Sequence, residues 1–174
     1  MNPTPARILV MTGEQSACVK IVGRANFTSS VDFKACVNEL VERGCRRFVL
    51  DLSECVLMDS TFLGVLAGFG LKLRNGNDDP ARQGLELLNP SPRIIELLET
   101  LGVLHLFKVT QGSLTPAAET QPIECMPTNP SKAEASRTSL EAHQTLMDIN
   151  PANVAKFKDV TQFLAEGLKK SKSE

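Results

Sequence analysis

The first 110 residues alternate between two patterns of hydrophobic positions. Short apolar runs bounded by turn residues are typical of β-strands, whereas apolar residues every three or four positions are typical of helices that cover a sheet. The short runs lie at residues 7–11, 17–23, 46–53, 85–89 and 106–110. Each of these runs is a predicted strand.

Three helical segments separate the strands. A helix is predicted over residues 29–44, with Ser30 as its N-cap and Gly44 as its stop. Further apolar stripes at helical spacing, each expected to face the sheet, run over Phe62–Leu73 and Ile94–Leu101. The order β-β-α-β-α-β-α-β predicts an α/β fold, in which helices pack on a mixed sheet of four or five strands.

The composition of the chain changes after Gln111. Residues 112–131 are rich in proline, threonine and alanine, which predicts a linker or an irregular arm with little regular structure. Residues 132–174 are compatible with helices and form a C-terminal helical extension. We therefore divide the chain into a domain at 1–111, a linker or arm at 112–131 and the extension at 132–174.

The second half of the extension has the clearer helical pattern. We expect a continuous helix from Asn150 to about Lys169, with Asn150 as its N-cap and with Phe157 and Leu164 buried. Three arrangements of the extension are open: it could fold back on the domain, pair with a second copy to form a dimer, or supply a partner-binding element. Folding back ranks first, because apolar helix stripes more often pack within their own chain.

Composition and charge exclude some classes of function. Hydrophobic residues make up 42% of the chain and charged residues 22%, as in ordinary soluble domains. The net charge of −1 does not suggest a nucleic-acid-binding protein. The sequence has neither an apolar run long enough to span a membrane nor the N-terminal pattern of a secretory signal. We therefore expect a cytoplasmic protein with no nucleic-acid partner and no membrane insertion.

The residues that usually carry catalysis or bind metals are sparse. The five cysteines are scattered without a C-x-x-C pair, and the two histidines, His105 and His143, lie far apart in the sequence. This pattern argues against a disulfide framework and against a metal site. A glycine-rich phosphate loop and a nucleophile elbow are also missing from the sequence. We expect a protein without a cofactor that acts by binding and not as an enzyme.

One polar triplet, Asp59-Ser60-Thr61, interrupts the apolar stretch that runs from Asp51 to Leu73. Asp59 is well placed to cap the helix whose apolar stripe begins at the next turn, and the two hydroxyls would then lie in its first turn. Capping alone is enough to explain the triplet. A functional interpretation needs a further observation.

That observation is a resemblance to a known family. The stretch "FVLDLSECVLMDSTFLGVLAGFGLKLRNGN" resembles the signature of the sulphate-transporter and anti-sigma-antagonist (STAS) domain. In that family, a strand that ends in D-L-S is followed by M-D-S-S/T-G-L-G at the start of a helix. The matching positions are Asp51, Leu52, Ser53, Met58, Asp59, Ser60, Thr61, Leu63 and Gly64. The resemblance covers roughly residues 7 to 110 and implies a STAS-like fold for the domain.

The resemblance also implies a function. In stand-alone bacterial members, which are anti-sigma factor antagonists, a partner that is both an anti-sigma factor and a serine kinase phosphorylates the first serine of the motif, and a serine phosphatase reverses the modification. This role carries over to Ser60, with Thr61 as the alternative. The unphosphorylated protein would bind the anti-sigma factor, and the phosphorylated protein would release it. A second contact region follows the second strand, in "GRANFTSS", where Asn26 replaces the Asp of many members. The implied partner-binding residues are Arg24, Asn26, Phe27, Thr28, Met58, Ser60, Thr61 and Phe62.

One residue departs from the family pattern. Phe62 stands where the family usually has glycine, and it either packs inward in phase with Val65 and Phe69 or changes the contact surface. We expect the Ser60 hydroxyl to be accessible to another protein. The alternative function is a constitutive STAS adaptor, or a subunit of a transporter-associated or sensory complex, without a phosphoswitch.

Overall fold

A mixed sheet organises the fold. The computed structural model describes residues 6–75, 85–112 and 121–172. The strands are β1 (Arg7–Gly13), β2 (Ser16–Ala25), β3 (Arg47–Asp51), β4 (Cys55–Met58), β5 (Leu85–Leu88), β6 (Phe107–Thr110) and β7 (Ile123–Cys125). Within the described ranges their order is β6-β5-β3-β2-β1-β7, with β4 paired to the far end of β2. β1 runs antiparallel to both of its neighbours, and all other pairs are parallel.

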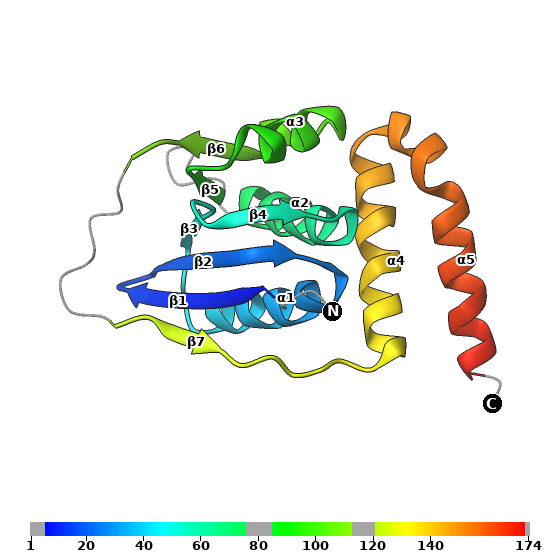
Figure 1. Ribbon diagram of the computed structural model, residues 1–174, viewed down its shortest axis with the longest axis horizontal. Coiled ribbons are helices and arrows are strands. Elements are labelled where there is room, and N and C mark those ends of the chain that lie inside the picture. Colours follow the sequence, from blue (N-terminus) through cyan, green and yellow to red (C-terminus); the bar gives the residue numbers. More distant parts are fainter. Residues whose placement is uncertain (1–5, 76–84, 113–120, 173–174) are drawn as a thin grey trace.

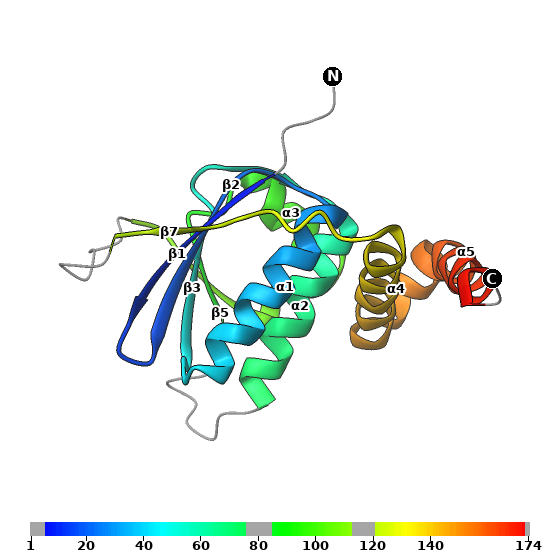
Figure 2. The ribbon, with the colours of Figure 1, turned by 90° about the horizontal axis from the view of Figure 1, so that it is seen from below.

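Helices cover one face of this sheet. α1 (Phe27–Glu42) and α2 (Ser60–Asn75) lie side by side on that face, as Figure 2 shows. α3 (Pro92–Thr100) and a one-turn 3₁₀ helix (Leu104–Leu106) connect β5 to β6. The predicted α/β class and the predicted order of the three helices are confirmed.

Aromatic side chains from the helices and the sheet form the centre of the core. The ring centroid of Phe33 on α1 lies 4.9 Å from that of Phe62 and 6.4 Å from that of Phe69. Phe48 of β3 meets Phe69 edge to face, with 4.9 Å between the centroids. Phe69 and Leu98 are both buried. The inward phases predicted for α2 and α3 are therefore confirmed.

The sheet has seven strands in the described part of the chain, and not the predicted four or five. The two strands missing from the prediction are short: β4 has four residues and β7 has three. β5 and β6 are also only four residues long, but each lies between helical segments, whereas β4 follows β3 after three residues and β7 lies in a proline-rich segment. Both pair with a longer strand that offers a free edge, β4 with the end of the ten-residue β2 and β7 with β1.

The start of α1 also differs from the prediction. Its N-cap is Asn26 and not Ser30, because the helix begins directly where β2 ends. The Asn26 side chain accepts hydrogen bonds from the backbone N–H groups of Thr28 and Ser29, at 3.1 and 3.0 Å, and the Ser29 side chain completes a capping box. Ser30 is buried inside the first turn. The predicted stop at Gly44 is confirmed, since this residue takes φ = 101° just after the helix.

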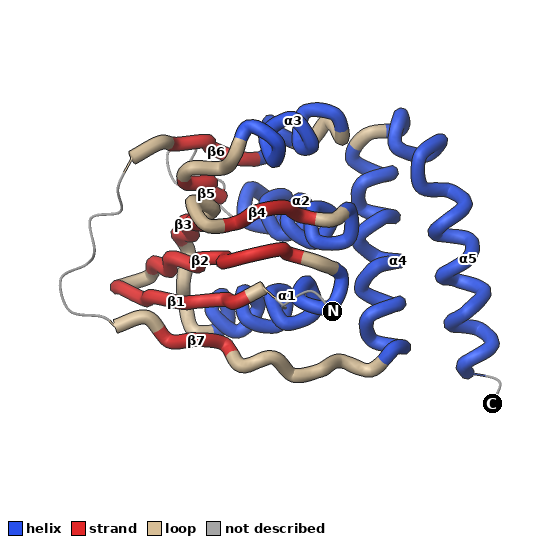
Figure 3. Tube along the Cα trace, in the orientation of Figure 1, coloured by secondary structure: helices blue, strands red, loops and turns tan. Residues whose placement is uncertain are grey.

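The C-terminal extension folds back on the domain, which is the first of the three predicted arrangements. The segment before the extension, predicted as a linker or arm with little regular structure, contains β7, which joins the sheet edge, while residues 113–120 lie outside the described residues. Cys125 of β7 lies with Sγ 3.3 Å from the Sγ of Cys36 on α1. α4 (Lys132–Ile149) then packs across α1 and α2, and α5 (Val154–Lys172) packs beside α4, as Figures 1 and 3 show. We call α4 and α5 together the C-terminal hairpin.

The second helix of the hairpin matches its prediction in part. The Asn150 side chain accepts a hydrogen bond from the backbone N–H of Ala152, at 3.2 Å, so the predicted cap is confirmed. The first turn, Pro151–Asn153, is nevertheless a 3₁₀ helix, and α5 proper follows it. Phe157 and Leu164 are half-buried and not fully buried. Only one side of α5 faces α4, so its apolar stripe stays partly open to solvent.

Candidate functional site

Asp59 begins the candidate site by fixing the start of α2. Its Oδ1 accepts a hydrogen bond from the backbone N–H of Phe62, at 2.8 Å, as expected of an N-cap. Its own backbone N–H donates to the carbonyl of Ala25, at 3.0 Å, which joins the end of β4 to the end of β2. The predicted cap is therefore confirmed, and it holds Ser60 and Thr61 in the first turn of α2.

The Asp59 carboxyl lies in a partly dehydrated position. Burial raises the pKa of Asp59 above its ordinary value of 3.8, because the charged form loses contact with water. Backbone hydrogen bonds, chiefly from Phe62, and the nearby ring of His143 lower this pKa and offset part of the effect. The carboxyl thus caps the helix at some cost in solvation.

The hydroxyls of Ser60 and Thr61 both contact α4. Ser60 Oγ lies 2.8 Å from His143 Nε2, and Thr61 Oγ1 lies 2.9 Å from Ser139 Oγ. The other ring nitrogen, His143 Nδ1, lies 2.7 Å from the backbone carbonyl of Ser139. A carbonyl can only accept, so Nδ1 carries the proton in the neutral ring, and Nε2 accepts a hydrogen bond that the Ser60 hydroxyl donates.

His143 lies between Ser60 of α2 and Phe157 of α5. Its side chain is buried, and its ring lies 4.9 Å from the ring of Phe157 on α5, centroid to centroid. The hydroxyl of Ser60 is therefore covered by a side chain that is itself packed inside the hairpin. Ser60 itself is half-buried, and its hydroxyl, which we expected to be accessible to another protein, is engaged in this conformation by a helix some 80 residues further along the chain.

The second predicted contact region, at the end of β2, lies beside the same helix start. Phe27 is 51% exposed, Arg24 is exposed and Thr28 is half-buried. Asn26 is engaged in capping α1, so its side-chain oxygen already accepts backbone hydrogen bonds. Asn26 therefore has a structural role in shaping this loop.

A hollow of about 850 Å³ brings the two regions together. The domain contributes Phe27 and Thr28 from α1 and the triplet 59–61, and the hairpin contributes the opposite wall. Of the predicted contact residues, Met58 and Phe62 lie in the core, 2% and 0% exposed, so they cannot contact a partner from the surface. Phe62 packs on Phe33, which is the inward alternative.

Sequence reasoning did not find the roles of Ser139 and His143. Both lie on the face of α4 that is turned to the domain, where the buried neighbours are mostly small: Ala135, Thr138 and Ala142. This alternation of small buried positions was the available signal, since small residues permit close helix contacts. It does not show which helix they would meet.

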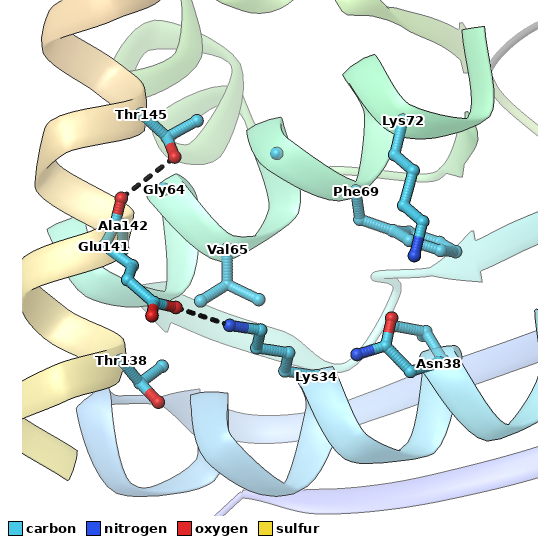
Figure 4. Close-up of a pocket in the computed structure, with 12 residues that line it drawn as sticks. Lys34, Asn38, Gly64, Val65, Phe69, Lys72, Thr138, Glu141, Ala142 and Thr145 are labelled. Atoms are coloured by element: carbon cyan, nitrogen blue, oxygen red, sulfur yellow. Dashed lines mark hydrogen bonds and ion pairs between the residues drawn. The ribbon is translucent and has the colours of Figure 1, made fainter. Parts of the chain in front are cut away.

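A second, smaller hollow of about 210 Å³ lies between α1, α2 and α4 (Figure 4). Lys34 of α1 pairs there with Glu141 of α4, with 2.7 Å between Nζ and Oε2. Gly64 of α2 meets α4 so closely that an added Cβ would lie 2.5 Å from the carbonyl oxygen of Ala142. Only glycine permits this approach of the two backbones.

Comparison with protein families identifies the domain. The family model of the STAS domain matches residues 7–115, so the chain belongs to the STAS family. A comparison with curated protein sequences finds no match.

Solved structures support the same fold. The anti-sigma factor antagonist SpoIIAA in its unphosphorylated form is similar with a TM-score of 0.50 and 18% identity, over 60% of this chain and 87% of SpoIIAA. A protein of Thermotoga maritima, provisionally assigned as an anti-sigma factor antagonist, is similar with a TM-score of 0.52 and 16% identity, over 62% of this chain and 88% of its own. The predicted STAS-like fold is confirmed.

No helix in the described ranges is long and apolar enough to cross a membrane. The same ranges contain no group of three or more His, Cys, Asp or Glu side chains that could hold a metal ion. The polar groups that line the hollow at the start of α2 are hydroxyls, the Asp59 carboxyl, the His143 imidazole and the side chains of Lys132 and Lys156.

Proposed function

We propose that this protein is an anti-sigma factor antagonist controlled by phosphorylation. In its unphosphorylated form it binds a cytoplasmic partner that is both an anti-sigma factor and a serine kinase. Phosphorylation of Ser60 releases that partner, and a serine phosphatase restores binding. The protein acts through its surface and not by catalysis. Thr61 is the alternative acceptor of the phosphate.

The observation that carries this proposal is the position of Ser60. It is the first residue of α2, directly after the Asp59 cap, in a domain of the STAS family. The exposed ring of Phe27 lines the same hollow. A partner that covers Phe27 would therefore lie close to Ser60. Modification of one hydroxyl can then affect the whole contact.

The physical chemistry of a phosphate at this position favours a change of surface over a change of fold. The first N–H groups of a helix and its dipole stabilise an anion, so phosphorylated Ser60 is compatible with a folded α2. The phosphate adds about 1.5 to 2 negative charges to the contact surface. An apposed acidic or apolar surface would then lose affinity by roughly a hundredfold, which corresponds to about 2.7 kcal/mol.

The test compares Ser60→Ala with Ser60→Asp in the full chain. The partner is captured from native lysate with the Ser60→Ala protein and identified, and its affinity for both variants is then measured. We expect Ser60→Ala to bind like the unmodified protein and Ser60→Asp to bind much more weakly. Ser91→Asp is the matched control, because Ser91 is the N-cap of α3 and aspartate caps equally well. It should leave the affinity unchanged.

One observation favours the second candidate function, a constitutive adaptor. The Ser60 hydroxyl is already engaged by His143 of the same chain. If the Ser60→Ala and Ser60→Asp proteins bind the partner with equal affinity, and no phosphate is found on Ser60 or Thr61 in cells, the adaptor becomes the better account.

A further inference from the structure

We propose that the C-terminal hairpin is a cover in cis, which competes with the partner and the kinase for the start of α2. This inference rests on the proposed function, because it concerns access to the same serine. The matched family region ends at residue 115, whereas the hairpin begins at Lys132. The cover is therefore a property of this chain's own extension.

The first support is the occupation of both candidate phosphate acceptors. Transfer of the γ-phosphoryl group of ATP to Ser60 forms a bond from Oγ to phosphorus, breaks the bond from phosphorus to the ADP oxygen and passes the hydroxyl proton to a base of the kinase. The imidazole of His143 lies 2.8 Å from that Oγ, and the hydroxyl of Ser139 lies 2.9 Å from the Thr61 oxygen. A kinase cannot align its nucleotide with either oxygen while α4 is docked.

The second support is the close fit of α4 to the domain. The backbone of α4 at Ala142 touches α2 at Gly64, where even a methyl group would collide. Leu146 of α4 is 0% exposed and joins the core of the domain. The Lys34–Glu141 ion pair, drawn in Figure 4, also connects α4 to α1, but both side chains are exposed and the pair adds little to stability. The close fit selects one docked position.

The third support is the anchoring of the hairpin turn. The buried side-chain amide of Asn153 donates to the backbone carbonyl of Leu101, just after α3, and to that of Leu146, both at 2.9 Å. Lys156 donates to the carbonyl of Thr100, at 3.1 Å. The hairpin is thus held at its turn as well as along α4, so its docked state is a defined structure that a competitor must displace.

The hairpin can leave without unfolding the domain. The ring of Phe163 on α5 is 74% exposed, and Val160 is 38% exposed, so α5 contributes little buried surface to the domain. The strands of the sheet pair with one another, and none of them pairs with the hairpin. Regions with few buried contacts open at a lower free energy than the core. Undocking of α4 would expose Leu146 as well, but it breaks no strand pairing of the sheet, so Ser60 and Thr61 would become accessible together while the sheet stays paired.

The first experiment measures the cover by itself, in the full chain. Thr61 is 4% exposed beneath α4, so Thr61→Cys should react slowly with N-ethylmaleimide. A second substitution, Ala142→Leu, lies on the hairpin and overpacks its contact with Gly64. We expect it to raise the labelling rate at position 61, read by peptide mass spectrometry, by on the order of tenfold or more. Ala155→Leu is the matched control, because Ala155 is exposed on α5.

Hydrogen exchange distinguishes undocking of α4 from unfolding of the whole domain. Amides of β2 and β3 should keep wild-type protection in the Ala142→Leu protein, while amides of α4 lose it. Should β2 and β3 also lose protection, His143→Ala, which removes the bond to Ser60 without adding volume, replaces Ala142→Leu. The proposal is overturned if the α4 amides of a variant exchange fast and the labelling rate at position 61 is nevertheless unchanged.

The second experiment tests whether undocking of the hairpin speeds the phosphorylation of Ser60 or Thr61. Wild-type, Ala142→Leu and Ala155→Leu proteins, all with native Ser60 and Thr61, are incubated with ATP and native lysate, and phosphate on each residue is quantified. Faster phosphorylation of Ala142→Leu alone supports the inference. Equal rates in all three proteins overturn it. Fast labelling at position 61 with no phosphate on any protein is a third result: it retains the cover and rejects the phosphoswitch.

Discussion

Two surfaces meet at Ser60, and they are built in different ways. The start of α2 is assembled from neighbours in sequence, since Asp59 caps an N–H only three residues away. The facing surface of α4 acts at long range, since His143 and Ser139 meet residues about 80 positions earlier in the chain. The first surface belongs to the STAS family, and the second belongs to this chain's extension. The difference teaches that a familiar site can be fully formed and still be covered by its own chain.

The largest expected effect is the difference in stability loss between a substitution in the core and one in the hairpin. Phe62 is fully buried against Phe33, so Phe62→Ala should lower the free energy of unfolding by about 3–5 kcal/mol. Phe163 on α5 is 74% exposed, and Phe163→Ala should change it by no more than about 0.5 kcal/mol. Urea unfolding followed by far-UV circular dichroism measures both, because the chain has no Trp or Tyr. Similar losses for the two variants would show that the hairpin and the domain form one cooperative unit.

The next prediction breaks the contact between the two surfaces from the domain side. Gly64→Ala places a methyl group against the Ala142 backbone and should detach α4, while α2 itself gains up to about 1 kcal/mol in helix propensity. Hydrogen exchange should therefore quicken in α4 and not in α2. Gly68→Ala is the matched control, since its Cβ would lie at an ordinary 3.6 Å from Thr145 Cγ2. Equal exchange in α4 of both variants would contradict the close-contact argument.

The smallest expected effect concerns the cap. Asp59→Ala removes the acceptor for the Phe62 N–H and should lower stability by about 1 kcal/mol. Asp59→Asn keeps a capping oxygen and should lose less. Denaturant unfolding of both variants near neutral pH measures this difference. A larger loss for the asparagine variant would show that the charge at position 59 matters more than the cap.

The same cap gives a pH dependence with a definite sign. Burial raises the pKa of Asp59 above 3.8 in the folded state, so the folded protein binds this proton more tightly than the unfolded chain. The proton-linked part of the contribution of Asp59 to stability is therefore fully present below pH 3.8 and is lost as the pH rises through the higher folded value, whereas the hydrogen bond of the cap remains. The stability of the wild type relative to Asp59→Asn should fall over that window. A rise would mean that hydrogen bonds to the carboxylate outweigh its desolvation.

Local rules and long-range contacts explain what could be predicted from sequence. The stripe that contains Phe62 and Phe69 revealed the buried face of α2, because a helical period is a property of neighbouring residues. The chemistry of Asp59 revealed the cap for the same reason. β4 and β7 have no helix beside them in the sequence to set them apart, and they depend on the free edges of β2 and β1. The contact of His143 with Ser60 depends on where a distant helix docks, which no local pattern encodes.

β7 has a consequence for the solution behaviour of shortened forms of the protein. An unpaired edge strand is a template for pairing between molecules, and native proteins often cover such edges. β7 covers the outer edge of β1, and the Arg7–Glu124 ion pair connects the two strands there. A protein cut at residue 111 would lose this strand along with the hairpin and would tend to aggregate through β1. A protein cut just before Lys132 would keep the edge closed, and it is the better choice for isolating the uncovered domain.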